Sequence, residues 1–270
     1  MIDLDPAPRP QSLTLTFFGI HVLGRDVALS SGCVIEIFER VGVTEEAVRS
    51  TLTRMVNRGL LDRHRQGRRM YFGLTPRAVA VLRDGHDRVW STGAVNRHWR
   101  GQWTLVGFSL PEAWRRQRHD LRSRLTWGGF GPLQNGLWVA PGEADVAALL
   151  GDLGLDAHLR VFRGTVLEPT EVAQVVETAF DTGAIAAGYR AFLERWSGPA
   201  DRPDDPLRRQ LLLHTDWLEL VRRDPHLPAE HLPADWPAIP AEELFRAIAR
   251  EVAAAAGREA ARLMETVPTG

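Results

Sequence analysis

Arginine is the residue type whose number and spacing most directly suggest chemistry in this chain of 270 residues. All 33 basic residues are arginine, and none is lysine. Seventeen of these arginines lie at positions 49–124, a segment that contains only five of the 34 acidic residues. This local excess of positive charge predicts a surface that binds a polyanion. A general bias toward arginine would explain the missing lysine, but it would not explain why acidic residues are scarce in this segment alone.

Double-stranded DNA is the polyanion that suits this segment, because a polar helix and a basic hairpin follow one another there. Residues 44–58 predict a helix, and residues 60–74 predict two strands that turn at Gly67. The side chains expected to read base edges in the major groove are Ser50, Thr53, Arg54 and Asn57. The side chains expected to hold the phosphates are Arg49, Arg58, Arg65, Arg68 and Arg69.

Other kinds of chemistry lack the residues that they require. Without lysine, the chain cannot form a Walker phosphate site, a Schiff base to pyridoxal phosphate or a kinase-type ion pair. Cys33 is the only cysteine, which excludes an intrachain disulfide and a cysteine-based zinc site. The acidic start is no signal peptide, and no run of ~18 apolar residues occurs, so we expect a soluble cytoplasmic protein.

Two further motifs suggest catalysis or metal binding, and each has a simpler structural explanation. Residues 107–111 approach the nucleophile elbow of hydrolases, but Pro111 stands in place of the final glycine. Ser109 is explained instead as the cap of the next helix, in a capping box with Glu112. His226 and His231 lie in a proline-rich stretch without further ligands, which favours exposed loop histidines. We therefore predict no catalytic residue, no metal site and no cofactor.

The elements that position the DNA-binding residues predict a winged helix-turn-helix domain over residues 1–92. Apolar spacing indicates a first helix at 11–23 and a second helix that stops near Gly42. Thr44 caps the third helix, and Gly59 closes it. The basic hairpin follows, and then a helix with proline in its first turn. Three helices followed by a hairpin is the order of elements in a winged helix.

Residues 99–166 predict a second domain of the ferredoxin-like type, with the order βαββαβ. Strand patterns can be located at 103–108, 137–140 and 158–162, and the helical patterns end at Leu125 and cover 143–153. A glycine-rich bend at 127–132 separates the first helix from the strand at 137–140.

Residues 167–270 predict a mainly helical third domain, so that the chain as a whole belongs to the α+β class. Helical patterns cover 170–196, 207–221 and the segment from Pro240 to about Met264. Prolines punctuate the stretch 224–237. The apolar helix at the end of the chain either packs on its own domain or is shared with a second subunit.

Three features, taken in order along the chain, resemble the PaaX-like family of transcriptional regulators, the phenylacetic-acid-degradation repressors. The resemblance covers about residues 12–265, and the proline-rich loop is its most specific part. The matching segments are 44–49 and 67–71 in the winged helix, 103–106 at the start of the middle domain, and 223–228 with 232–237 in the proline-rich loop. Ala238 follows Trp236-Pro237 where we expect glycine in the family, and this departure concerns loop geometry rather than function.

The resemblance implies a homodimer that binds an inverted repeat in promoters of aromatic-catabolism genes. It also implies release from DNA by an acyl-coenzyme A thioester, typically phenylacetyl-CoA. The chain has nine tryptophans, which could surround an aromatic acyl group while arginines hold the phosphates of CoA. The expected effector-binding residues are Trp99, Arg100, Trp103, Arg124, Trp127 and Trp138. Core and interdomain packing is the alternative for each of these tryptophans.

Two functions from other classes remain as alternatives. The middle domain is similar to small CRISPR-associated nucleases of ferredoxin-like fold, which suggests a metal-dependent nucleic-acid-processing enzyme. Such nucleases carry a metal-binding aspartate at the end of the first strand, where this chain reads Phe108-Ser109-Leu110. The third possibility is an interaction module whose acidic C-terminal region neutralises its basic half.

Overall fold

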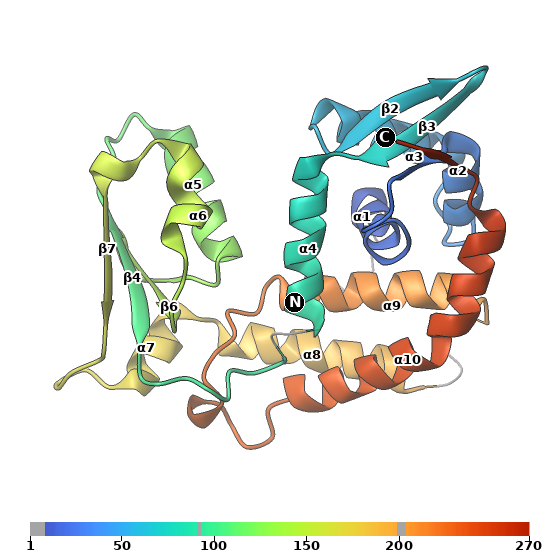
Figure 1. Cartoon of the computed structure of the whole chain (residues 1–270). Helices are drawn as coiled ribbons and strands as arrows, with labels where there is room; N and C mark the ends of the chain where they lie inside the picture. Colours follow the sequence, from blue (N-terminus) through green and yellow to red (C-terminus); the bar gives the residue numbers. More distant parts are fainter. Residues whose placement is uncertain (1–8, 91–92, 199–203, 270) are drawn as a thin grey trace. The chain divides into compact units, whose positions relative to one another are not determined.

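The computed structural model describes residues 9–90, 93–198 and 204–269. The chain has the expected α+β composition, with two antiparallel four-stranded sheets and many helices (Figure 1). Contacts divide it into two compact units: unit 1 comprises residues 1–91, 191–218 and 240–270, and unit 2 comprises residues 92–190 and 219–239. The three predicted domains follow chain order, whereas these units divide the last hundred residues between them.

Unit 1 begins with three helices whose starts follow from the sequence. They are α1 (Pro10–His21), α2 (Ser31–Glu39) and α3 (Glu45–Asn57). The Ser30 hydroxyl accepts from the backbone N–H of Cys33 at 3.2 Å and caps α2. The Thr44 hydroxyl accepts from the N–H of Ala47 at 3.3 Å and caps α3. The helices share a core that contains Phe17, Phe38 and Leu52, all of them buried.

A sheet with the strand order β2-β3-β1-β8 completes the N-terminal part of unit 1. Its strands are β1 (Val27–Ser30), β2 (Leu61–Gln66), β3 (Arg69–Leu74) and β8 (Thr266–Pro268). The predicted hairpin is formed by β2 and β3, and Gly67 at its turn has a φ of 61°. Strands β1 and β8 were not predicted from the sequence, because four and three residues are too few to give a periodic pattern. The last strand of the chain therefore lies in the same sheet as the basic hairpin.

The remaining helices of unit 1 pack around aromatic side chains. They are α4 (Pro76–Trp90), α9 (Pro206–Val221), α10 (Ala238–Leu263) and the end of α8 (Thr182–Ser197). Trp217 stacks on Phe245 with ring centroids 4.7 Å apart. Trp90 contacts both His214 and Phe245, at 5.9 and 5.5 Å between centroids. Segments from both ends of the sequence thus share one core.

Unit 2 contains the second sheet, with the strand order β5-β6-β4-β7. The elements follow the chain as β4 (Trp103–Phe108), α5 (Arg115–Trp127), β5 (Gly131–Gln134), β6 (Leu137–Pro141), α6 (Val146–Leu150), β7 (Leu159–Gly164) and α7 (Val172–Ala179). Short 3-10 turns lie at Gly151–Leu153, Asp156–His158 and Ala229–His231. The prediction placed β5 in a glycine-rich bend and extended α6 at both ends.

Two local predictions about unit 2 are wrong. Helix α5 begins at Arg115, and its N-cap residue Trp114 makes no side-chain capping bond, so Ser109 and Glu112 do not form a capping box. Residues before the helix form a turn instead, in which the N–H of Trp114 donates to the carbonyl of Pro111. His226 and His231 are half-buried rather than exposed.

The proline-rich loop is fixed by the half-buried side chain of Asp224. Asp224 accepts from the Tyr189 hydroxyl at 2.6 Å and from the backbone N–H of His226 at 2.8 Å. Burial raises the pKa of the Asp224 carboxyl, while these hydrogen bonds lower it. Leu227, two residues further on, lies in the core beside Trp103. The loop is therefore an ordered part of unit 2.

Candidate nucleic-acid interface

Helix α3 has an apolar face in the core of unit 1 and a polar face in solvent. Val48, Leu52 and Met55 are buried, as the apolar spacing predicts. The four side chains expected to read base edges, Ser50, Thr53, Arg54 and Asn57, are all exposed. The β2–β3 hairpin lies next to this helix (Figure 1), and Arg63 Nη2 is 3.5 Å from Thr53 Oγ1. The helix thus presents a polar surface of the required kind beside the hairpin.

Arginine side chains surround this polar face, and their own contacts differ. Arg49 forms an exposed ion pair with Glu45 at 2.7 Å, and Arg58 donates to the Gln11 side chain at 2.8 Å. Arg65 donates to the carbonyl of Gly67 at 3.3 Å. Exposed i,i+4 ion pairs contribute only about 0.3–0.5 kcal/mol, so a phosphate could replace Glu45 at small cost.

Arg68 and Arg69 are adjacent in the hairpin but have different surroundings. Arg68 is exposed, and it makes no hydrogen bond or ion pair within the part of the chain that the structure describes. Arg69 forms an ion pair with Glu265, although 67% of its side chain is exposed. The pKa of the Glu265 carboxyl lies below its usual value, chiefly through a hydrogen bond with the Ser30 side chain and also through Arg69. Two of the five expected phosphate contacts, Arg49 and Arg69, are therefore already paired with carboxylates.

Glu265 was not predicted from the sequence as part of this surface. The residue lies 196 positions from Arg69 and joins the end of α10 to β8. The sequence contains no signal that would connect the two, because their contact depends on the pairing of β8 with β1.

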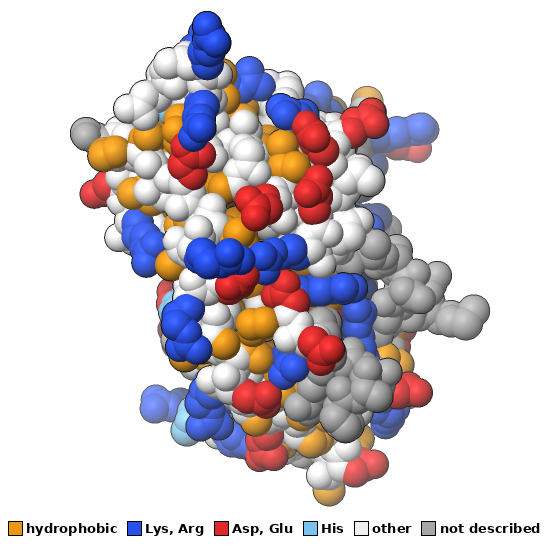
Figure 2. Space-filling view, turned by 90° about the vertical axis from the view of Figure 1, so that its right-hand side faces the viewer, with side chains coloured by type: hydrophobic (Ala, Val, Ile, Leu, Met, Phe, Trp, Pro, Cys, Tyr) orange, Lys and Arg blue, Asp and Glu red, His pale blue; other side chains and the backbone are white. Residues whose placement is uncertain are grey.

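Not every face of the molecule carries an excess of positive charge. The face drawn in Figure 2 mixes basic and acidic side chains over its whole area. Pairs between Arg40 and Glu259, Arg209 and Glu251, and Arg262 and Glu259 are formed by the C-terminal helix in unit 1. The hairpin differs from this mixture, because its four arginines stand against a single acidic residue, Asp62.

The six residues expected to bind an effector are not arranged around one cavity. Trp103 and Trp138 are buried in different clusters on opposite faces of the unit 2 sheet. Trp99 packs edge-on against Trp103, at 5.4 Å between centroids. The Trp127 ring lies 4.6 Å from the guanidinium carbon of Arg222, and Arg124 pairs with Asp152 at 2.7 Å. Arg100 is exposed. The structure thus groups Trp99 with Trp103 and separates the others from them.

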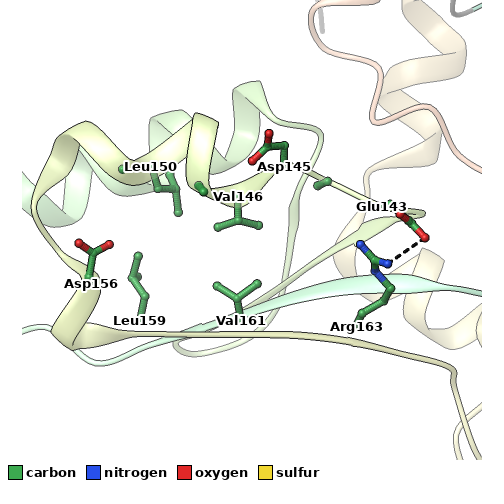
Figure 3. Close-up of a pocket in the computed structure, with 11 residues that line it drawn as sticks. Glu143, Asp145, Val146, Leu150, Asp156, Leu159, Val161 and Arg163 are labelled. Carbon is green, nitrogen blue, oxygen red and sulfur yellow. Dashed lines mark ion pairs between the residues drawn. The ribbon is translucent and has the colours of Figure 1, made fainter.

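An open groove of about 680 Å³ lies in unit 2 between α6 and β7 (Figure 3). Its apolar lining includes Val146 and Leu150 from α6 and Leu159 and Val161 from β7, which point toward one another in the figure. Glu143 and Arg163 form an ion pair of 2.9 Å at one end. Asp145 and Asp156 add two carboxylates to the lining. None of the six expected effector residues lines this groove, and its excess of carboxylates is unfavourable for the phosphates of CoA.

The described residues offer neither a cluster of metal-binding side chains nor a helix that could cross a membrane. No group of three histidine, cysteine or acidic side chains is placed so that it could hold a metal ion in the described ranges. Within the same ranges, every helix is too short or too polar to cross a bilayer.

Comparison with known proteins gives matches along most of the chain. Residues 9–78 match the family model described as PaaX-like protein, residues 96–176 match the PaaX protein central Cas2-like domain, and residues 180–262 match the PaaX-like protein C-terminal domain. The chain is 28% identical over 260 residues to the transcriptional repressor PaaX of Escherichia coli (strain K12), covering 91% of this chain and 81% of that protein. It is similar in fold to the solved structure of the uncharacterized protein Rv0674 from Mycobacterium tuberculosis, with a TM-score of 0.63 and 23% identity. That match covers 96% of this chain and 99% of the other.

Proposed function

The chain belongs to the PaaX-like family, and from this premise we propose that it is a transcriptional repressor that binds double-stranded DNA. The observation that carries the proposal is the exposed polar face of α3 beside a hairpin whose arginines, Arg63, Arg65, Arg68 and Arg69, are all exposed. A helix of this kind fits the major groove, and arginines on an adjacent hairpin reach the phosphates or the minor groove. We interpret α1 to α3 with the hairpin as a winged helix-turn-helix.

The side chains of this surface divide into two roles. Ser50, Thr53, Arg54 and Asn57 contact base edges and determine which sequence is bound. Arg49, Arg58, Arg65 and Arg68 hold phosphates and set the position of the protein on the duplex. Arg69 acts with Glu265 and contributes less positive charge than Arg58, Arg65 and Arg68, which have no carboxylate partner among the described residues. A protein with this function works in the cytoplasm, where it meets its operator.

Unit 2 would then carry regulation and assembly. Its strand order β5-β6-β4-β7 and the sequence of its elements agree with a ferredoxin-like domain. From the family resemblance we propose a homodimer on an inverted repeat near genes of aromatic catabolism. An acyl-CoA thioester such as phenylacetyl-CoA would release it from DNA. Because the named relative is a repressor, we assign regulation rather than metal-dependent processing of nucleic acid.

Titration of duplex DNA tests the central part of the proposal. Fragments from the region upstream of the gene, and a scrambled duplex of equal length, are titrated at two salt concentrations. We expect tight binding to one upstream site, weaker binding to the scrambled duplex, and an affinity that falls steeply with salt. Absence of binding at low salt, or equal affinity for all sequences at both salts, would overturn the proposal.

A thermal-shift series tests the effector separately. Phenylacetyl-CoA, other acyl-CoA thioesters, free CoA and the free acids are compared for their effect on the melting midpoint. The proposed effector class requires that at least one thioester raises the midpoint more than CoA and the free acids do. If no thioester does so, the protein responds to a different ligand.

A further inference from the structure

The end of the chain is built into the same sheet as the proposed DNA-binding hairpin. Strand β8 pairs with β1 through Leu29–Thr266, Ala28–Val267 and Val27–Pro268. The N–H of Ser30 donates to the carbonyl of Glu265 at 2.9 Å, and the N–H of Thr269 donates to the carbonyl of Asp26 at 3.1 Å. Strand β1 is therefore flanked by β3 on one side and by the C-terminal strand on the other.

Glu265 reaches across β1 to the hairpin. Its Oε1 atom accepts from the hydroxyl of Tyr71 at 3.2 Å and is paired with the guanidinium of Arg69. Arg69 and Tyr71 are two residues apart in β3 and so face the same side of the sheet. Tyr71 is buried, with 5% of its surface exposed, whereas Arg69 extends into solvent. One carboxylate oxygen thus contacts both a buried and an exposed side chain of β3.

The position of Glu265 is itself determined by helix α10. Arg40 at the end of α2 binds Glu259 on α10 at 2.9 Å and Asp205 before α9 at 3.1 Å. Those three side chains are only 25–30% exposed, so water screens their pairing less than it screens an exposed pair. Thr269 also packs over Gly73, where an added Cβ would lie 3.0 Å from its methyl carbon. The last turn of α10 and the strand after it are thereby fixed on the sheet.

We propose that Glu265 is a positioning residue for the hairpin, and that the C-terminal strand is part of the DNA-binding surface. The carboxylate orients Arg69 through one contact and anchors Tyr71 through the other, so that β3 presents its arginines in one arrangement. Since the hairpin is taken to bind DNA, this inference rests on the proposed function. It adds to that function that residues near the C-terminus determine how tightly the hairpin binds DNA.

A simpler role for Glu265 makes the opposite prediction. If the carboxylate only opposed the phosphates by its charge, removing it would strengthen DNA binding whatever replaced it. A positioning role requires an acceptor at Oε1, which glutamine retains and alanine lacks. The two substitutions therefore separate positioning from repulsion.

The experiment compares Glu265→Gln, Glu265→Ala and the control Glu243→Ala in the full chain. Glu243 is an exposed carboxylate near the start of α10, far along the helix from β8. We expect E265A to weaken binding to the specific site ~5-fold, as the loss of two hydrogen bonds at a contact surface can do. E265Q should remain within ~2-fold of the unsubstituted chain, and E243A should match it. Equal effects of E265Q and E265A, in either direction, would overturn the proposal.

Hydrogen exchange of the DNA-free protein supplies a second readout. Amides of residues 67–74 should exchange faster in E265A than in the unsubstituted chain, and E265Q should resemble the latter. Unchanged exchange in E265A would also overturn the positioning role. If the unsubstituted chain bound no DNA, the proposed function would fail, yet the exchange rates would still decide whether Glu265 positions the hairpin.

Discussion

Two arginines on the proposed DNA surface should affect binding in different ways. Arg54 lies on the exposed face of α3, and Arg68 lies at the hairpin turn without a protein partner among the described residues. We expect Arg54→Ala to reduce discrimination at one base pair by ~1–3 kcal/mol, because a bidentate contact to a base edge is lost. Arg68→Ala should weaken all duplexes alike and lower the salt slope by about one, because a single phosphate contact is lost.

Binding to a set of single-base operator variants, each at several salt concentrations, separates these effects. Arg83→Ala, which removes an exposed arginine of α4, is the control for a general loss of charge. If Arg68→Ala changed base preference, or Arg54→Ala changed only the salt slope, the two roles would have to be exchanged.

His214 makes the stability of unit 1 depend on pH. Burial lowers the pKa of His214 to about 4, and the side chain packs between Trp90 and Phe245. The folded protein therefore binds this proton less readily than the unfolded chain, whose histidines titrate near 6.5. The contribution of His214 to the free energy of unfolding is therefore fully present above pH 6.5. It falls as the pH is lowered toward 4, by about 2 kcal/mol at pH 5.

The substitution His214→Leu tests this pH dependence, since leucine fills a similar volume and carries no charge. Urea unfolding at pH 7 and pH 5 should show a smaller loss of stability in the variant than in the unsubstituted chain. His21, whose pKa is also lowered by burial, remains in both proteins, and its charge contributes to lowering the pKa of His214. An identical loss in both proteins would mean that His214 does not titrate in this way.

At the scale of elements, the glycine at the start of β5 is required by a close approach of α7. A Cβ on Gly131 would clash with the carbonyl of Ala179 and the ring of Phe180. Because the first of these atoms belongs to the backbone, it cannot move aside easily. We expect Gly131→Ala to destabilise the protein by about 1–3 kcal/mol in urea unfolding followed by tryptophan fluorescence. Gly164→Ala in β7 is the matched control, since a Cβ there would meet nothing within 4 Å.

The elements that could be predicted from the sequence are those defined by local signals. Thr44 and Gly59 delimit α3, and Gly67 marks the turn of the hairpin, so the polar face of α3 could be placed from the sequence alone. Strands β1, β5 and β8 have three or four residues and form only where a partner strand meets them. Their existence depends on contacts distant in sequence, which a local pattern does not contain.

The same limit applies to the candidate site. The exposure of Arg54 and Asn57 follows from helical periodicity and could be predicted. The ion pair of Arg69 with Glu265 could not, because it requires β8 to lie beside β1. The expectation that tryptophans line one cavity relied on composition, and the sheet places Trp103 and Trp138 on opposite faces. Alternation along paired strands decides such faces, and the register of β4 with β6 was not known from sequence.

At the scale of the whole molecule, the N-terminal segment depends on the end of the chain for its stability. The carbonyl of Trp90 accepts from Arg246 at 3.1 Å, and the Trp90 ring packs against Phe245. The hydroxyl of Thr215 donates to that of Thr16 at 3.0 Å in the interior. Strand β8 completes the sheet of the hairpin. A fragment of residues 1–95 would lose all of these contacts and expose the apolar surfaces that they cover.

We therefore expect the 1–95 fragment to lack a cooperative thermal transition and to bind DNA more weakly than the full chain. Circular dichroism melts and duplex titrations at low salt measure the two properties side by side. Masking of the basic segment by an acidic C-terminal region predicts the reverse, namely tighter or less selective binding by the fragment. A cooperative melt near the midpoint of the full chain, together with tighter binding, would favour masking. In that case the C-terminal helices would restrain the DNA-binding surface rather than support it.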